Sequence, residues 1–365
     1  MTMEKKMIMG LNRRTLLKTG TAAVGALAMP GLLRAQDKPD EIIVRAWGGA
    51  WGDALKEGVG DPFTAATGIK VRYDFTEDNE IKPKIWAAVD QGRVPPIHVN
   101  WDTTVNATIS ALRGVTTDLS DLSNLANLLP LAKPEGLDGV PLVNTYAYVY
   151  VLAYRPEAFP DGPPKSWDVL TDPKFKGRIA LYDDGIGFNA ISVLAGGGTI
   201  DDIPDNMDAG WEFYRKVKAN APLLGEDADF TTWFQNGEID VACTISVNAR
   251  EAKQNGIAVE WTVPEEGCKV DTDCLWVPKG LPANEEHWAK EFVNFALSKD
   301  AQQKWCAALG LPPVYPGIEP PADLVGDPSY PTKPEDFAKL VSIPSPVLVN
   351  SQAEWFAKFN EIFQG

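Results

Sequence analysis

The chain contains 365 residues, enough for two domains of ordinary size that each bury a hydrophobic core. Hydrophobic residues make up 44% and charged residues 23% of the chain, which is typical of a globular protein and excludes a disordered or fibrous one. The net charge of −16 argues against nucleic-acid binding, because clustered cations drive the binding of phosphates.

The first 35 residues are typical of an export signal rather than of a folded domain. A basic start, a short apolar run over residues 19–29 and Ala35 before a polar stretch form the pattern of a signal peptide. Within it, Arg13 and Arg14 with the following Leu16 and Lys18 are similar to a twin-arginine signal, and an ordinary secretory leader is the alternative. We therefore predict a signal peptide over residues 1–35, the twin-arginine export machinery as a partner, and a periplasmic location.

Removing this leader makes the remaining protein more acidic. Residues 1–35 hold six basic residues and one acid, so the remainder carries 28 basic and 49 acidic residues, a net charge of −21. All four cysteines lie in this part of the chain, and an oxidising compartment permits up to two disulfides among Cys243, Cys268, Cys274 and Cys306. Their spacing disfavours zinc, and no metal or other cofactor is predicted.

Strands and helices alternate along the rest of the chain. The residues predict a strand over 41–47, a helix containing Leu55, Val59 and Phe63, and a strand over 69–73, which together form a βαβ unit. Further strands are expected at 96–100, 146–154, 179–182, 241–245 and 273–278, and helices at 81–91, 104–112 and 289–309. This alternation predicts an α/β fold with parallel sheets.

Aromatic and acidic residues gather where these strands end. Because ligands bind at the carboxyl ends of strands in such sheets, these residues are candidates for one cleft. A cleft of this composition favours a cation or an amine, which carboxylates bind by charge-assisted hydrogen bonds and aromatic faces by cation–π attraction. The candidates are Trp47, Trp101, Asp102, Tyr146, Asp184 and Asp271.

Catalysis has little support in the sequence. His98 and His287 stand in no catalytic motif, no Gly-x-Ser-x-Gly sequence occurs, and residues 195–199 lack the lysine of a phosphate-binding loop. The residues therefore give no catalytic frame, and the chain is not expected to be an enzyme. An exported hydrolase that uses paired carboxylates is the competing class.

Several motifs follow one another along most of the chain after residue 35. They are Asp61-Pro62-Phe63, Thr67-Gly68-Ile69, residues 164–179 around Ser166-Trp167-Asp168, Asn236-Gly237-Glu238 and Pro264-Glu265-Glu266-Gly267. Together they resemble the solute-binding proteins of ABC transporters, and the spermidine/putrescine-binding type most of all. The resemblance implies a two-lobed type II periplasmic binding protein fold with a ligand cleft between two discontinuous α/β lobes. It places residues 36–146 and 264–313 in the first lobe, and residues 147–263 and 314–365 in the second.

The same resemblance implies roles for individual residues. Trp47 matches the aromatic residue that packs on a polyamine's methylene chain, and Asp273 matches the aspartate that holds an amino group. Asp271 stands where that branch has a tryptophan. Asp184 matches an acid of the distal amine site. Trp233 offers a ring in place of the tryptophan expected at Ile245.

The function implied is the capture of a small organic cation and its delivery to an ABC permease in the inner membrane. A polyamine such as putrescine or spermidine is the expected ligand, and a quaternary amine or an amino acid derivative is the alternative. The protein is expected to be a monomer that binds no nucleic acid. Core packing remains the alternative for Tyr146 and Trp233, and helix capping for Asp184.

Overall fold

The computed structural model describes residues 38–365. The chain divides into the units Met1–Lys38 and Pro39–Gly365, and the following account concerns the second unit. The predicted signal peptide and its twin-arginine motif lie outside the described residues. In the part of the chain that is described, no helix has the length and apolar character needed to cross a membrane.

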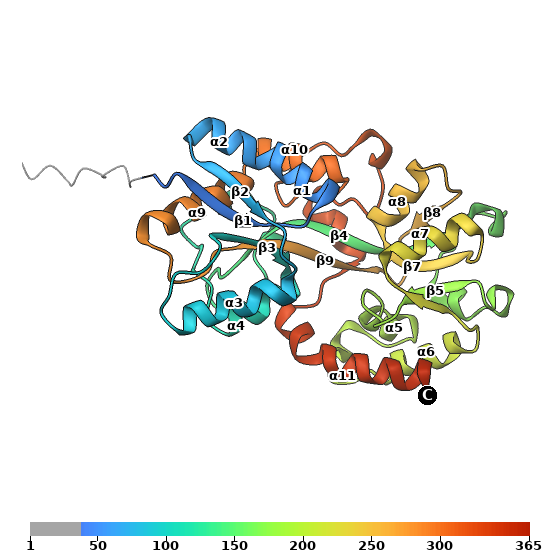
Figure 1. Cartoon of the computed structure of the whole chain (residues 1–365). Coiled ribbons are helices and arrows are strands. Elements are labelled where there is room, and N and C mark those ends of the chain that lie inside the picture. The colour runs from blue at the N-terminus through green and yellow to red at the C-terminus, as the bar shows by residue number, and fades with distance from the viewer. Residues whose placement is uncertain (1–37) are drawn as a thin grey trace, which may run out of the picture. The chain divides into compact units, whose positions relative to one another are not determined.

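One mixed sheet runs through the described unit, with the strand order β2-β1-β3-β9-β4-β7-β5-β6 (Figure 1). Two short strands lie off this path, since β8 pairs with β4 and β10 pairs with β9. The strands are β1 Glu41–Arg45, β2 Lys70–Asp74, β3 Val99–Thr103, β4 Val143–Tyr154, β5 Ile179–Tyr182, β6 Leu223–Gly225, β7 Val241–Ile245, β8 Glu260–Thr262, β9 Cys268–Trp276 and β10 Leu340–Val341.

The two ends of the sheet are parallel and its middle is antiparallel. Strand β1 pairs in parallel with β2 and β3, and β5 pairs in parallel with β6 and β7. Between these halves, β4 and β9 pair with each other in antiparallel fashion and each joins a different half, β9 to β3 and β4 to β7. The two long strands β4 and β9 therefore carry the chain from one half to the other.

Each half has its own hydrophobic core. One core packs around β1, β3 and the helices α9 and α10, and the other around β5, β7 and the helices α5, α6 and α11. On β4 the first core ends with Tyr146 and the second begins with Ala147, and on β9 Val270 belongs to the second core and Leu275 to the first. The α/β class predicted from the alternation of elements is confirmed.

Eleven α-helices are present among residues 38–365, together with one π-helical turn and several 3₁₀ turns. The α-helices are α1 Gly49–Leu55, α2 Asp61–Thr67, α3 Asp78–Asp90, α4 Thr104–Leu112, α5 Asn189–Ala195, α6 Asp208–Lys218, α7 Asp227–Asn236, α8 Ser246–Gln254, α9 Ala283–Ala296, α10 Lys299–Leu309 and α11 Ser345–Gln364. The π-helical turn is η1 Lys56–Gly60, and the 3₁₀ turns are η2 Ser123–Asn127, η3 Pro130–Ala132, η4 Pro156–Ala158, η5 Trp167–Thr171, η6 Pro173–Phe175, η7 Ile200–Asp202, η8 Ala322–Leu324 and η9 Pro334–Lys339.

Capping residues explain where several helices start and stop. The Thr103 hydroxyl accepts a hydrogen bond from the Asn106 amide and begins α4, as predicted. The single helix expected over 289–309 is wrong, because Ser298 caps a new helix, α10, immediately after α9 ends. Gly310 then ends α10 with a φ of 70°, a conformation that favours glycine.

Three strands differ from the sequence prediction in ways that affect the site. Strand β3 lies three residues later than the predicted 96–100, so Trp101 and Asp102, which follow the predicted strand, lie within the observed one. Strand β4 starts three residues before the predicted 146, and β9 starts at Cys268, five residues before the predicted start at Asp273. These differences decide which side chains share a face of the sheet.

Candidate functional site

Three pairs of facing residues line one face of β4 and β9, and we call them the tyrosine–charge ladder. Tyr146 lies opposite Asp273 and Tyr148 opposite Asp271. The third pair is Tyr150 and Lys269, and the Lys269 ammonium lies 5.2 Å from the centre of the Tyr150 ring. Because alternate residues of a strand share a face, the six side chains project on the same side of the two strands that join the halves.

Asp273 is a buried carboxylate with half of its hydrogen-bonding capacity unused. The Tyr146 hydroxyl donates to its Oδ2 at 2.6 Å, whereas its Oδ1 is buried and has no hydrogen-bond partner. Burial raises the pKa of Asp273 to about 7, and the Tyr146 hydrogen bond opposes that rise. A buried acceptor of this kind is costly to leave unpaired, and a cationic donor reaching it would restore the missing bond.

Indole rings form a wall beside this carboxylate. The Trp47 ring centre lies 4.7 Å from that of Trp101, and the Trp101 ring meets Tyr146 at 6.1 Å in a perpendicular arrangement. Trp51 lies 6.2 Å from Trp101 and 6.3 Å from Tyr146. Trp47 and Trp51 are half-buried while Trp101 and Tyr146 are fully buried, so the first two rings are the outer surface of the wall.

The middle pair of the ladder is slightly more exposed than its neighbours. Tyr148 is partly buried and the Asp271 side chain is 10% exposed, whereas Asp273 and Lys269 on either side are 6% and 4% exposed. Asp271 pairs with the Lys269 ammonium. Tyr148 packs against both hydrophobic cores. A ligand that reaches the ladder therefore meets Tyr148 and Asp271 first.

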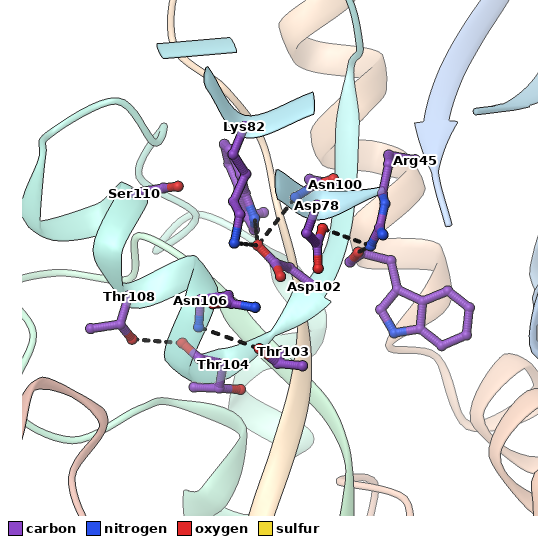
Figure 2. A network of polar contacts seen from close by, with 12 residues as sticks. Arg45, Asp78, Lys82, Asn100, Asp102, Thr103, Thr104, Asn106, Thr108 and Ser110 are labelled. Atoms are coloured by element: carbon purple, nitrogen blue, oxygen red, sulfur yellow. Dashed lines mark hydrogen bonds and ion pairs between the residues drawn. The ribbon is translucent and has the colours of Figure 1, made fainter. Parts of the chain in front are cut away.

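Asp102 points away from this wall, although it follows Trp101 directly. Neighbouring residues of a strand face opposite sides, and the Asp102 Oδ2 accepts hydrogen bonds from the side chains of Asn100 at 3.3 Å and Trp276 at 3.4 Å. The Lys82 ammonium of α3 lies 4.0 Å from the same oxygen, and Figure 2 shows this contact beside the Arg45–Asp78 ion pair. Burial raises the pKa of Asp102 to about 8. Asp102 thus belongs to a buried polar network under α3.

Arg45 connects that network to the wall. Its guanidinium pairs with Asp78 at 2.9 Å, donates to the carbonyl oxygen of Trp101 at 2.8 Å and lies 5.0 Å from the centre of the Trp47 ring. The side chain is 1% exposed, so its charge is fixed in position. It holds the end of β1, and with it Trp47, against β3.

Asp184 lies in a separate part of the second half, at the edge of a cavity of about 390 Å³. Its Oδ1 accepts a hydrogen bond from the Ile186 amide at 2.7 Å, as a turn-forming aspartate does. Burial raises the pKa of the Asp184 carboxyl, and Lys269 of the ladder, which lines the same cavity, opposes the rise. Asp184 and Lys269 therefore line the same cavity, which connects Asp184 to that end of the ladder.

Trp233 is not brought to the aromatic wall. It lies in α7 and packs edge-on to Phe230 at 5.7 Å, against the second core. The structure thus unites Trp47, Trp101, Tyr146, Asp271 and Asp273 around the joining strands, connects Asp184 to them through Lys269, and places Asp102 and Trp233 elsewhere.

The sequence reasoning missed Lys269 and Arg45. Both are basic residues inside strands, whereas the predicted cation site contained only acidic and aromatic residues. Lys269 precedes Asp271 by two residues and Asp273 by four. Because alternate residues of a strand share a face, this spacing places Lys269 on the same face as the two acids.

The cysteines and acids form no further chemical centre in the described part of the chain. All four cysteines are buried free thiols, so neither of the two permitted disulfides is present. Among residues 38–365, no three His, Cys, Asp or Glu side chains are grouped to hold a metal ion.

The sheet has two parallel halves with separate cores, and the paired strands that join them carry a buried carboxylate beside indole rings. This arrangement is typical of a two-lobed solute-binding protein. Residues 59–332 match the family model described as bacterial extracellular solute-binding protein, and the chain belongs to this family. The prediction of a periplasmic substrate-binding protein of an ABC transporter, and not an enzyme, is confirmed.

Individual relatives and structures agree with this family. The spermidine/putrescine-binding periplasmic protein of Salmonella typhimurium is 26% identical over 303 residues, which cover 80% of this chain and 82% of that protein. A putative 2-aminoethylphosphonate-binding periplasmic protein of the same species is 26% identical over 67% of this chain and 69% of its own length. The ABC transporter substrate-binding protein of Bradyrhizobium japonicum has the same fold, with a TM-score of 0.74 and 22% identity over 89% of this chain and all of that one.

Proposed function

We propose that the protein captures a small organic amine in its protonated form at the tyrosine–charge ladder and delivers it to an ABC permease. The observation that carries the proposal is the Oδ1 of Asp273, a buried acceptor without a partner beside a wall of indole rings. A protonated amine supplies both a donor for that oxygen and a cation for the rings.

The surroundings of Asp273 favour an amine over a neutral solute. Asp271 is the next charged residue on the same face, and the half-buried rings of Trp47 and Trp51 offer the apolar surface that a hydrocarbon chain needs. The names of the two relatives support the same class, since polyamines and 2-aminoethylphosphonate share a primary amino group. Putrescine and spermidine are therefore the first ligands to test.

Lobe closure would complete the capture. The residues 36–146 with 264–313, and 147–263 with 314–365, are the two lobes that we propose to close over the ligand and exclude water, and a permease would recognise the closed form. Trp47, Trp101, Tyr146, Asp271 and Asp273 form the proposed site. Asp184 contributes through the neighbouring cavity.

Calorimetric titration with amines, sugars, amino acids and metal salts tests the proposal. We expect saturable binding of a primary amine, lowered at least about tenfold by Asp273→Asn, because a charged hydrogen bond is replaced by a neutral one. The exposed Asp138→Asn is the matched control and should leave the affinity unchanged. Binding of an anion or a sugar without any binding of amines would refute the proposal.

A further inference from the structure

Lys269 is a buried cation on the face that would hold a cationic ligand. It lies four residues before Asp273 on β9, so the Cα atoms of the two residues are about 13 Å apart along the same face of the strand. Its side chain is 5% exposed, pairs with Asp271 and covers the Tyr150 ring. Burying an ammonium is costly unless it is paired, so its position requires an explanation.

The pairing with Asp271 leaves part of Lys269 unused. An ammonium group has three donors, and one contact with a carboxylate oxygen occupies one of them. The Tyr150 ring stabilises the ammonium by a cation–π contact and accepts no conventional hydrogen bond from it. At least one N–H remains for an acceptor that the ligand would bring.

Lys269 also lines the cavity of about 390 Å³ that lies between the β5–α5 loop, α4 and α11. It is the one cationic side chain among the residues of the cavity wall, all of which belong to the described part of the chain. Most of the wall is apolar, and Ile186 and Phe356 at this wall are 41% and 47% exposed. The cavity thus offers room for a hydrocarbon chain and one fixed positive charge.

A second ammonium group fits this end of the site poorly. It would lie beside the Lys269 ammonium in a partly desolvated region, where like charges repel strongly. Asp184 is the acid that could offset the repulsion. Its carboxylate is already held by the Ile186 amide, and burial favours its neutral form by raising its pKa.

We infer that Lys269 is a specificity-determining residue, and that it selects an amine with a carboxylate or phosphonate at its far end over a diamine of the same length. The inference rests on the proposed function, because it needs the amino group at the Asp273 end. The hydrocarbon chain then extends from the Asp273 end of the ladder toward the cavity, and the anionic oxygens accept hydrogen bonds from the Lys269 ammonium at the cavity wall.

The test compares putrescine with the ω-amino acid of the same chain length, by calorimetric titration of the same protein samples. The unaltered protein should bind the ω-amino acid at least about tenfold more tightly than putrescine. Lys269→Met should remove that preference, and Lys269→Arg, which keeps the charge, should retain it. Lys56→Met, at an exposed ion pair with Asp61, is the matched control and should change nothing.

A further variant and defined outcomes keep the result decisive. If Lys269→Met fails to fold because Asp271 loses its partner, the double variant Lys269→Met/Asp271→Asn removes both buried charges and replaces it. Tighter binding of putrescine by the unaltered protein, or an unchanged preference in the variant that removes the Lys269 charge, overturns the inference and leaves the proposed function standing. Absence of binding of every amine overturns both.

Discussion

Replacing Asp273 by asparagine should make the unliganded protein more stable and the complex weaker. In the folded protein the pKa of Asp273 is raised to about 7 from an ordinary value of 3.8, chiefly by burial. The folded state therefore holds this proton more tightly than the unfolded state does. The free energy of unfolding should fall as the pH rises from about 4 to about 7, and the full loss should persist above that range.

The size of this effect follows from the shift. One pKa unit corresponds to about 1.4 kcal/mol, so a shift of about three units costs at most about 4 kcal/mol above pH 7. Asparagine is neutral at every pH, and its amide oxygen can still accept the hydrogen bond from Tyr146. Asp273→Asn should thus recover part of that cost at pH 8 and little of it at pH 4.

Urea unfolding of both proteins between pH 4 and pH 8, without ligand, measures this difference. Amine affinity in the unaltered protein should rise with pH until about pH 7, because the cation binds the ionised carboxylate, and should level off above it. In Asp273→Asn this dependence should disappear along with most of the affinity. A variant that is less stable than the unaltered protein at pH 8, or an affinity with the same pH profile in both proteins, would refute the reasoning.

Four further substitutions distinguish residues that would contact the ligand from residues that stabilise the fold. Trp47→Ala should weaken amine binding by about 2- to 30-fold, the range of a cation–π contact, whereas Trp305→Ala should mainly lower the free energy of unfolding, by about 3–5 kcal/mol, because that ring is fully buried. Asp102→Asn should leave amine affinity unchanged in titration and raise stability above pH 8, since burial raises the pKa of this carboxyl to about 8; a large loss of affinity would place Asp102 in the site. Gly58→Ala should cost about 1–3 kcal/mol in urea unfolding, because the added Cβ would lie 2.8 Å from the Trp305 amide nitrogen; an unchanged midpoint would contradict this packing.

The sequence predicted well those strands whose residues are mostly apolar and carry no charge. The strands 179–182 and 241–245 were located to the residue, and each is buried along most of its length. Strand β9 was placed too late, because Lys269 and Asp271 interrupt the apolar pattern that marks a buried strand. These charges are stabilised in the strand by pairing with each other and by the Tyr150 ring beside Lys269, contacts that no single-residue propensity contains.

The site was predicted in part for a related reason. Trp47 and Asp271 were chosen as residues near strand ends and Asp273 from the family resemblance, and the structure brings all three to the same region. Trp101 and Asp102 were both predicted to lie beyond the end of strand 96–100, where neighbouring side chains can point to the same place. In a strand their side chains point to opposite faces, so Trp101 packs in the indole wall and Asp102 lies near Lys82 under α3.

The ladder also explains how one ligand would affect both lobes. Tyr146 belongs to the first core and Tyr150 to the second, while Tyr148 between them packs against both. The strands β4 and β9 are hydrogen-bonded to each other along this stretch, so the halves cannot slide apart there and relative motion must bend or twist the pair. A ligand that engages Asp273 at one end and Lys269 at the other contacts side chains set against each core. Such a ligand would bind most tightly when the two lobes are placed so that Asp273 and Lys269 contact it at the same time. The difference in affinity between this arrangement and the others would drive lobe closure.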